Sequence, residues 1–187
     1  MRIIAGRWKG HPLVSFQADH IRPTTDRVKE TMFNMIQFYL ENARVLDLFC
    51  GTGNLGLEAL SRGAGHVLFV EKHPKSLQIT RDNLQKLKAG RDEYELQSQD
   101  VLRFLKTYTG EPFDLIFADP PFTEAMAHEV MEHASASAAF GAETLMMIES
   151  ARRERIDDEY ETLRRVDSRE FGDKILSFYR KKDHKGS

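Results

Sequence analysis

The chain has 187 residues, a length that suits one domain around a single core, and its 27 basic and 29 acidic residues give a formal net charge of -2. This balance excludes nucleic-acid binding through a global positive field, but it does not exclude a local basic patch. The single cysteine excludes an intrachain disulfide, and no run of ~18 apolar residues occurs, so we expect a cytoplasmic protein without a membrane segment.

The first segment, residues 2–13 (RIIAGRWKGHPL), mixes β-leaning residues with two glycines and predicts a short hairpin or extended arm. Trp8 lies between Arg7 and Lys9 and suits two roles equally well. It could stack on RNA beside the two cations, or it could anchor the hairpin against the rest of the fold.

Residues 21–40 predict an amphipathic helix. Pro23 and a cap at Thr24 or Thr25 would start it, with Asp26 in the first turn. Apolar side chains then recur near the spacing of 3.6 residues, at Val28, Met32, Met35, Ile36 and Tyr39.

From residue 43 the sequence alternates between strand-like and helical segments joined by short connections. This alternation predicts a parallel sheet with helices on both faces. The predicted strands cover residues 43–49, 66–71, 94–98, 113–118 and 144–149, and the predicted helices cover 55–63, 75–90, 100–108 and 124–134.

The end of the chain has a different pattern. Residues 161–170 and 174–181 are two strand-like stretches joined by Phe171-Gly172-Asp173, which predicts an antiparallel hairpin at the edge of the sheet. The fold class is therefore α/β. We divide it into an N-terminal arm at residues 1–25, expected to face RNA, and a main domain at residues 26–187.

The first predicted parallel strand leads directly into a glycine loop. Gly51, Gly53 and Gly56 have G-x-G-x-x-G spacing, which allows a tight turn and close approach of a ligand to the main chain. Glu71 ends the next strand, and its carboxylate offers two acceptor oxygens to ribose hydroxyls. We therefore expect a nucleoside-containing ligand, which this pattern alone does not resolve into NAD or S-adenosylmethionine.

Two further acids near the loop each allow two interpretations. Asp47, inside the strand, suits the ammonium group of a methionine, which favours S-adenosylmethionine, or it is a structural acid tied to nearby main-chain amides. Asp100 follows the third strand. It either accepts a hydrogen bond from an adenine amino group or caps the helix that begins at Val101.

The fourth strand ends in Asp-Pro-Pro-Phe. Ligands of open α/β sheets lie beyond the carboxyl ends of the strands, so we expect Asp119 to face the same crevice as the glycine loop. An exocyclic amine on a nucleobase is a poor nucleophile unless acceptors draw its N–H bonds toward tetrahedral geometry. Asp119 and the carbonyl of Pro120 could supply these acceptors on a backbone stiffened by Pro120 and Pro121, and Phe122 could stack on the base.

Two other patterns are interpreted as structural. His128 and His133 in HEVMEH are five residues apart, about 140° around a helix, which does not suit a shared metal ion, so we expect no metal. Cys50 lies at the end of the strand that leads into the glycine loop. We interpret it as a small packing residue rather than a nucleophile.

Six stretches between residues 1 and 180 resemble the RsmD family of small-subunit ribosomal RNA guanine-N2 methyltransferases, which are class I S-adenosylmethionine-dependent enzymes. They are MRIIAGRWKG, RPTTDRVKETMFN, VLDLFCGTGNLGLEALSRGA, FVEKHPKSL, FDLIFADPPF and FGDKILSFYRK. The resemblance implies a Rossmann-like, seven-stranded and mostly parallel sheet with an antiparallel last strand. The chain departs from the family pattern at Cys50, Asn54 and Lys174.

The resemblance also implies a set of site residues. It places catalysis at Asp119, Pro120, Pro121 and Phe122, and the cofactor S-adenosylmethionine at Asp47, Gly51, Gly53, Glu71 and Asp100. It sets RPTTDR beside the cofactor and the base, which adds Arg22 and Thr24 to the cofactor contacts. The expected RNA contacts are Arg7, Trp8, Lys9 and Arg27.

We therefore expect methyl transfer from S-adenosylmethionine to the exocyclic N2 of a guanine in 16S ribosomal RNA. The expected partner is ribosomal RNA or the small ribosomal subunit, and the chain is expected to act as a monomer. A DNA adenine-N6 methyltransferase is the alternative enzyme, because the same strand tip serves any exocyclic amine. The sequence is also compatible with a catalytically inactive RNA-binding assembly factor and with an NAD oxidoreductase.

Overall fold

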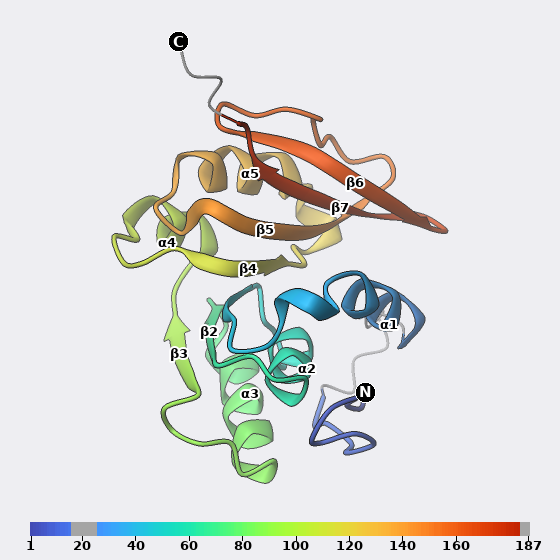
Figure 1. Ribbon diagram of the computed structural model, residues 1–187, viewed down its shortest axis with the longest axis vertical. Coiled ribbons are helices and arrows are strands. Elements are labelled where there is room, and N and C mark those ends of the chain that lie inside the picture. The colour runs from blue at the N-terminus through green and yellow to red at the C-terminus, as the bar shows by residue number, and fades with distance from the viewer. Residues whose placement is uncertain (16–25, 184–187) are drawn as a thin grey trace.

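The computed structural model describes residues 1–15 and 26–183, which form a twisted sheet flanked by helices (Figure 1). The predicted cofactor contacts Arg22 and Thr24 lie outside the described residues. The strands run across the sheet in the order β3-β2-β1-β4-β5-β7-β6. They are β1 (Arg44–Leu48), β2 (His66–Glu71), β3 (Tyr94–Ser98), β4 (Phe113–Ala118), β5 (Phe140–Ala151), β6 (Leu163–Phe171) and β7 (Lys174–Lys181).

The first five strands run parallel to one another, whereas β7 runs antiparallel to its neighbours β5 and β6. The central strands β1 and β4 are almost wholly buried, which explains their apolar sequences, since helices cover both faces of the sheet. The predicted α/β fold, with seven strands and an antiparallel last strand, is confirmed. Because β7 enters between β5 and β6, β6 forms the edge of the sheet.

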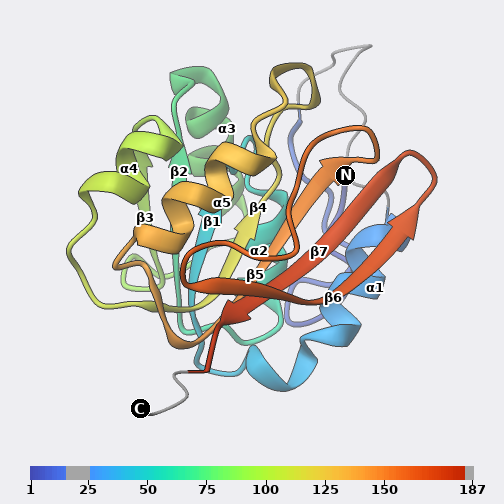
Figure 2. The same ribbon diagram turned by 90° about the horizontal axis from the view of Figure 1, so that it is seen from above.

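Each face of the sheet has its own helices and its own apolar cluster (Figure 2). One cluster joins the N-terminal arm to three helices, α1 (Asp26–Met35), α2 (Asn54–Ser61) and α3 (Pro74–Lys86). The other contains α4 (Val101–Thr107) and α5 (Ala127–Ala136). Over residues 1–15 and 26–183, none of the helices has the length and apolar character needed to cross a lipid bilayer.

The N-terminal arm forms the expected hairpin and packs on α2. The Ile3 N–H donates to the His11 carbonyl at 3.0 Å, which closes the hairpin. Trp8 is only 8% exposed, and its main-chain N–H donates to Ser61 Oγ at 3.1 Å. The anchoring interpretation of Trp8 is therefore confirmed. The expectation that its ring stacks on RNA is corrected, because the ring is buried in the cluster of α1 to α3.

Several helix boundaries differ from the predictions, and two of the differences have a structural cause. The helix expected over residues 21–40 ends at Met35 and is followed by a 3-10 turn, η1 (Gln37–Tyr39), as the chain turns back into β1. α5 starts three residues later than expected. Its first N–H, on Ala127, donates to Oε1 of Glu154 at 2.6 Å, so a residue far along the chain fixes where this helix begins.

Candidate active site

The carboxyl ends of β1, β2 and β4 bring two acidic residues to one level. Leu48, the last residue of β1, pairs with Val70 on one side and with Ala118 on the other. The residues that follow these two partners, Glu71 and Asp119, are therefore aligned at the same edge of the sheet. The strand order reverses between β1 and β4, and ligands of open α/β sheets bind at such a point.

Glu71 and Asp119 both line an open cleft of about 630 Å³. The other lining residues are Phe49, residues 72–73, residues 120–123, Ala151, and Asp173 and Lys174 at the turn between β6 and β7. Phe122 begins a 3-10 turn, η2 (Phe122–Glu124), and is 39% exposed. The structure therefore brings the four residues of the predicted catalytic segment into one space with the predicted ribose acceptor.

Left-handed backbone conformations shape the glycine loop after β1. Gly53 caps α2 with φ +85°, and Gly51 has φ +55°. A Cβ at Gly51 would meet only the Phe49 carbonyl oxygen, at 4.0 Å, so the main chain there faces open space, as close approach of a ligand requires. Phe49 has φ +57°, a strained backbone conformation for a phenylalanine. It also lines the cleft, a role that no sequence pattern predicts.

Asp47 is buried beneath this loop, with 2% of its surface exposed. Its Oδ2 accepts a hydrogen bond from the Gly56 N–H at 2.8 Å, so the structural interpretation of Asp47 is confirmed. Burial raises the pKa of Asp47 to about 7, the Gly56 hydrogen bond opposes this rise, and the charges of Asp119 and Glu71 add to it. Three carboxylates close enough to repel one another favour a cationic ligand.

Glu71 and Asp100 are both hydrogen-bonded to the main chain. Glu71 accepts the N–H of Gly51 at 3.0 Å and that of His73 at 2.9 Å, and its remaining lone pairs leave capacity for ribose hydroxyls. Asp100 accepts the Arg103 N–H at 3.0 Å, which confirms it as the cap of α4. The ribose and adenine contacts of these two acids stay predictions.

A cation that the sequence patterns do not assign to the site also lines the cleft. Lys174 begins β7, and its Nζ lies 4.3 Å from the centroid of the Phe122 ring. The same ammonium forms an ion pair with the buried carboxylate of Glu149. The one sequence signal for Lys174 is that it departs from the family pattern. Among the described residues, no three His, Cys, Asp or Glu side chains are grouped so that they could hold a metal ion.

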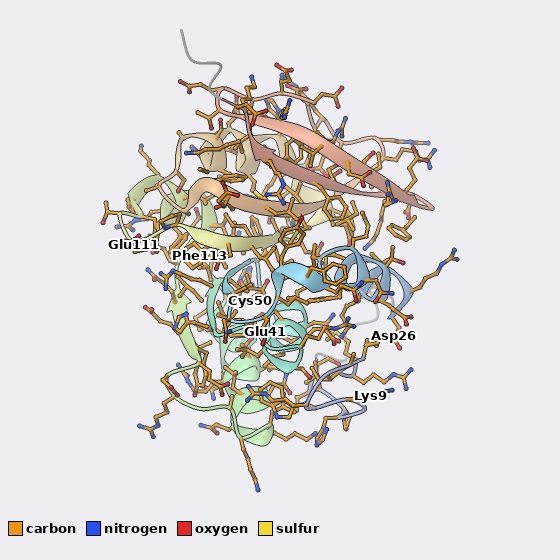
Figure 3. All side chains as sticks on the ribbon, viewed as in Figure 1. Lys9, Asp26, Glu41, Cys50, Glu111 and Phe113 are labelled. Carbon is orange, nitrogen blue, oxygen red and sulfur yellow. The ribbon has the colours of Figure 1, made fainter. Side chains whose placement is uncertain are left out.

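The predicted RNA contacts do not gather at the cleft. Arg7 forms a 2.6 Å ion pair with Glu93, directly before β3, whereas the cleft lies at the opposite ends of the strands. Lys9 is exposed on the N-terminal arm (Figure 3), and Arg27 is exposed on α1. The arm and the cleft are therefore separate surfaces of the molecule.

Comparisons with known proteins agree with one another. Residues 1–180 match the family described as Conserved hypothetical protein 95. Ribosomal RNA small subunit methyltransferase D of Haemophilus influenzae is 42% identical over 132 residues, which is 70% of this chain and 68% of that protein. Its namesake in Escherichia coli is 37% identical over 150 residues, or 80% of this chain and 74% of that protein. The solved structure of the Escherichia coli protein yhhF has a TM-score of 0.85 at 32% identity, covering 97% of this chain and 98% of that chain.

Proposed function

This chain belongs to the family described as Conserved hypothetical protein 95, the RsmD family, and on that premise we propose that it methylates the exocyclic N2 of a guanine in 16S ribosomal RNA. S-adenosylmethionine is the methyl donor. The observation that carries the proposal is the meeting of Glu71, Asp119 and Phe122 in one cleft directly beyond β1, whose end forms the glycine loop.

The residues around the glycine loop suit S-adenosylmethionine. Its sulfonium makes the methyl group electrophilic, and its positive charge suits the three carboxylates of Asp47, Glu71 and Asp119. The bare main chain at Gly51 would let the ligand approach closely, and Glu71 would accept from the ribose. We assign Gly53 and Asp100 to the same cofactor site, together with Arg22 and Thr24.

Asp119 is the residue we assign to activation of the amine. Its carboxylate would accept one N–H of the guanine amine, and the Pro120 carbonyl would accept the other, so the nitrogen lone pair is drawn out of conjugation with the ring. Pro120 and Pro121 hold these acceptors on a chain with little conformational freedom. Phe122, at 39% exposure, offers a face or edge against which a base can pack.

The substrate side of the proposal concerns RNA. We assign Arg7, Lys9 and Arg27 to contacts with ribosomal RNA outside the cleft, since all three carry positive charge on the described surface. The small ribosomal subunit would be the partner, the cytoplasm the compartment, and a monomer the active form.

The test is nucleoside mass spectrometry of small-subunit ribosomal RNA incubated with the protein and S-adenosylmethionine, both as free RNA and as assembled subunits. The expected product is N2-methylguanosine at one position. Protein carrying Asp119→Ala serves as the control for contaminating activities. Absence of any methylated nucleoside, or a methylated nucleoside other than N2-methylguanosine, would overturn the proposal.

A further inference from the structure

Three exposed cations surround a hollow at the end of α3, at the opposite end of β3 from the cleft. Arg81 lies on α3, and Lys88 and Arg91 lie in the connection to β3. The hollow has a volume of about 630 Å³, and no described residue that lines it is acidic. Tyr94, at the start of β3, supplies a half-buried ring to the same hollow. We name Arg81, Lys88 and Arg91 the α3 basic surface.

The α3 basic surface differs from the charged surface of β6 and of the segment before it, where arginines lie against acids. Many exposed arginines lie against an acid, such as Arg152 with Glu170 and Arg155 with Asp157. Within residues 1–15 and 26–183, none of the three cations of the α3 basic surface forms an ion pair. Among the described residues, the side chain of Arg81 donates only to the amide oxygen of Gln78, which is neutral. Their charge is therefore available to an anionic partner.

The position of the α3 basic surface continues that of the N-terminal arm. The Lys86 Nζ, on α3, donates to the Pro12 carbonyl at 3.1 Å. Arg7 of the arm pairs with Glu93, one residue before Tyr94. Figure 1 shows the end of α3 and the arm at the same end of the molecule. The exposed Lys9 therefore lies at the same end of the molecule as the end of α3.

We propose that the α3 basic surface binds the phosphodiester backbone of the RNA substrate as an anchor separate from the cleft. The inference rests on the proposed function, because it takes RNA as the substrate. Unpaired cations around a concave surface suit phosphates, which are spaced along the chain and carry no base-specific information. The anchor would hold RNA by charge, while the cleft selects the nucleotide.

The distance between the two surfaces sets a minimum length for the substrate. Tyr94 begins β3 at the hollow, and Ser98 ends it in register with Glu71 at the cleft. Four steps along a strand span on the order of 13 Å. An RNA that reaches only the cleft would not touch the α3 basic surface, whereas a longer fragment would touch both.

The experiment compares wild type with the triple variant Arg81→Ala, Lys88→Ala and Arg91→Ala. RNA affinity is measured by fluorescence anisotropy between about 50 and 200 mM salt. The slope of log affinity against log salt, which is negative, is expected to become less steep by about 2 to 3. The KM for long RNA should rise ~10-fold or more. Three quantities should not change. They are the affinity for S-adenosylhomocysteine, kcat at saturating RNA, and the turnover of an RNA fragment that fills the cleft but is too short to reach the α3 basic surface.

A matched control removes three cations of equal charge that are already paired with acids. Arg152→Ala, Arg155→Ala and Arg169→Ala together should change the salt slope much less, because Glu170, Asp157 and Asp167 already neutralise them. Equal losses in both triple variants, or no loss in the first, would overturn the inference while leaving the methylation of RNA intact. A wild type that neither binds nor methylates RNA would overturn the proposed function as well.

Discussion

The carboxylate of Asp47 and the main-chain N–H of Gly56 form a buried 2.8 Å hydrogen bond that ties the interior of β1 to the first turn of α2. This bond spans the glycine loop, so the conformation of the loop depends on an acid placed within the strand. A Cβ on Gly56 would overlap the ring of Phe69 and lie 2.9 Å from Asp47 Oδ2. The two residues therefore constrain each other.

Asp47→Asn should flatten the dependence of stability on pH. The pKa of Asp47 is about 7 in the folded chain against an ordinary value of 3.8, so between these values the folded state holds a proton that the unfolded state has released. The free energy of unfolding of wild type should therefore fall as the pH rises from about 4 to 7, by an amount on the order of a few kcal/mol. The variant cannot titrate there, and its amide oxygen still accepts from Gly56. Urea denaturation at pH 5 and pH 8 measures both slopes, and equal slopes would contradict the prediction.

Gly56→Ala should lower both stability and cofactor affinity. The added methyl group must displace Phe69 or Asp47, which costs about 1–3 kcal/mol in a packed interior. Gly172→Ala is the control. Gly172 has φ +63°, and no atom lies within 4 Å of the Cβ that the substitution adds, so this variant introduces backbone strain without a steric overlap. Thermal unfolding and calorimetry with S-adenosylhomocysteine are the measurements. Unchanged cofactor affinity in Gly56→Ala would show that the loop does not need this contact.

Asp119→Ala should abolish methyl transfer and leave affinity for S-adenosylhomocysteine within a few fold. Loss of an acceptor aimed at the reacting amine should slow the reaction by about 10²–10³ or more. Asp114→Ala is the matched control, since Asp114 lies on β4, the strand that Asp119 follows, and accepts from the Arg44 N–H at the other end of that strand. A radiolabel transfer assay with calorimetry separates the two effects. Retained transfer would remove Asp119 from the role we assign to it.

Lys29→Met should unfold the chain at a markedly lower urea concentration. Lys29 is 1% exposed and pairs with the fully buried Glu58 at 3.0 Å. Glu58 also accepts two N–H groups of the N-terminal arm, at Ile4 and Ala5. Glu58 keeps an ion pair with Arg62 at 2.9 Å, so loss of Lys29 removes one of its two cations and should cost about 1–3 kcal/mol.

The matched control for this prediction is Lys72→Met. The Lys72 ammonium lies 3.8 Å from Glu124, and both side chains are more than a third exposed. Exposed pairs of this kind contribute about 0–1 kcal/mol, so this variant should remain close to wild type. Similar losses of stability to urea in the two lysine variants would show that the burial of the Lys29–Glu58 pair does not determine its contribution to stability.

Cys50 should resist alkylation in the folded protein, and Cys50→Ala should retain methyl transfer. Burial raises the pKa of the Cys50 thiol well above its ordinary value, and the charge of Asp47 adds to this rise, so little thiolate exists at neutral pH. Cys50 as a residue is 7% exposed, which agrees with the packing role expected for it. Mass spectrometry after iodoacetamide treatment, with and without urea, is the measurement. Rapid alkylation of native protein would contradict the burial.

The residues of the site that belong to short sequence motifs could be predicted from the sequence. Glycines spaced for a tight turn, an acid at the end of the next strand, and Asp119 followed by two prolines each describe a local conformation. The parallel sheet then brings them together, because the carboxyl ends of its strands lie on one edge. The role of Asp100 can also be predicted from its neighbours in the sequence, because a helix that begins at Val101 needs an N-cap residue directly before it.

Contacts between distant residues could not be predicted in the same way. The start of α5 depends on Glu154, and nothing near Ala127 indicates that partner. The ammonium of Lys174 reaches Phe122 only because the last hairpin folds back beside β5. For Trp8 the sequence allows an exposed and a buried role equally, and only the packing of the arm on α2 decides between them.

The edge position of β6 has a consequence for how the protein behaves at high concentration. Its side chains include a nearly continuous series of charges, at Arg164, Arg165, Asp167, Arg169 and Glu170. A strand from a second molecule that extended the sheet there would have to align its own side chains with this charged row. The edge is therefore poorly suited to seed β-aggregation, which protects the part of β6 that lies beyond its contacts with residues 158–160.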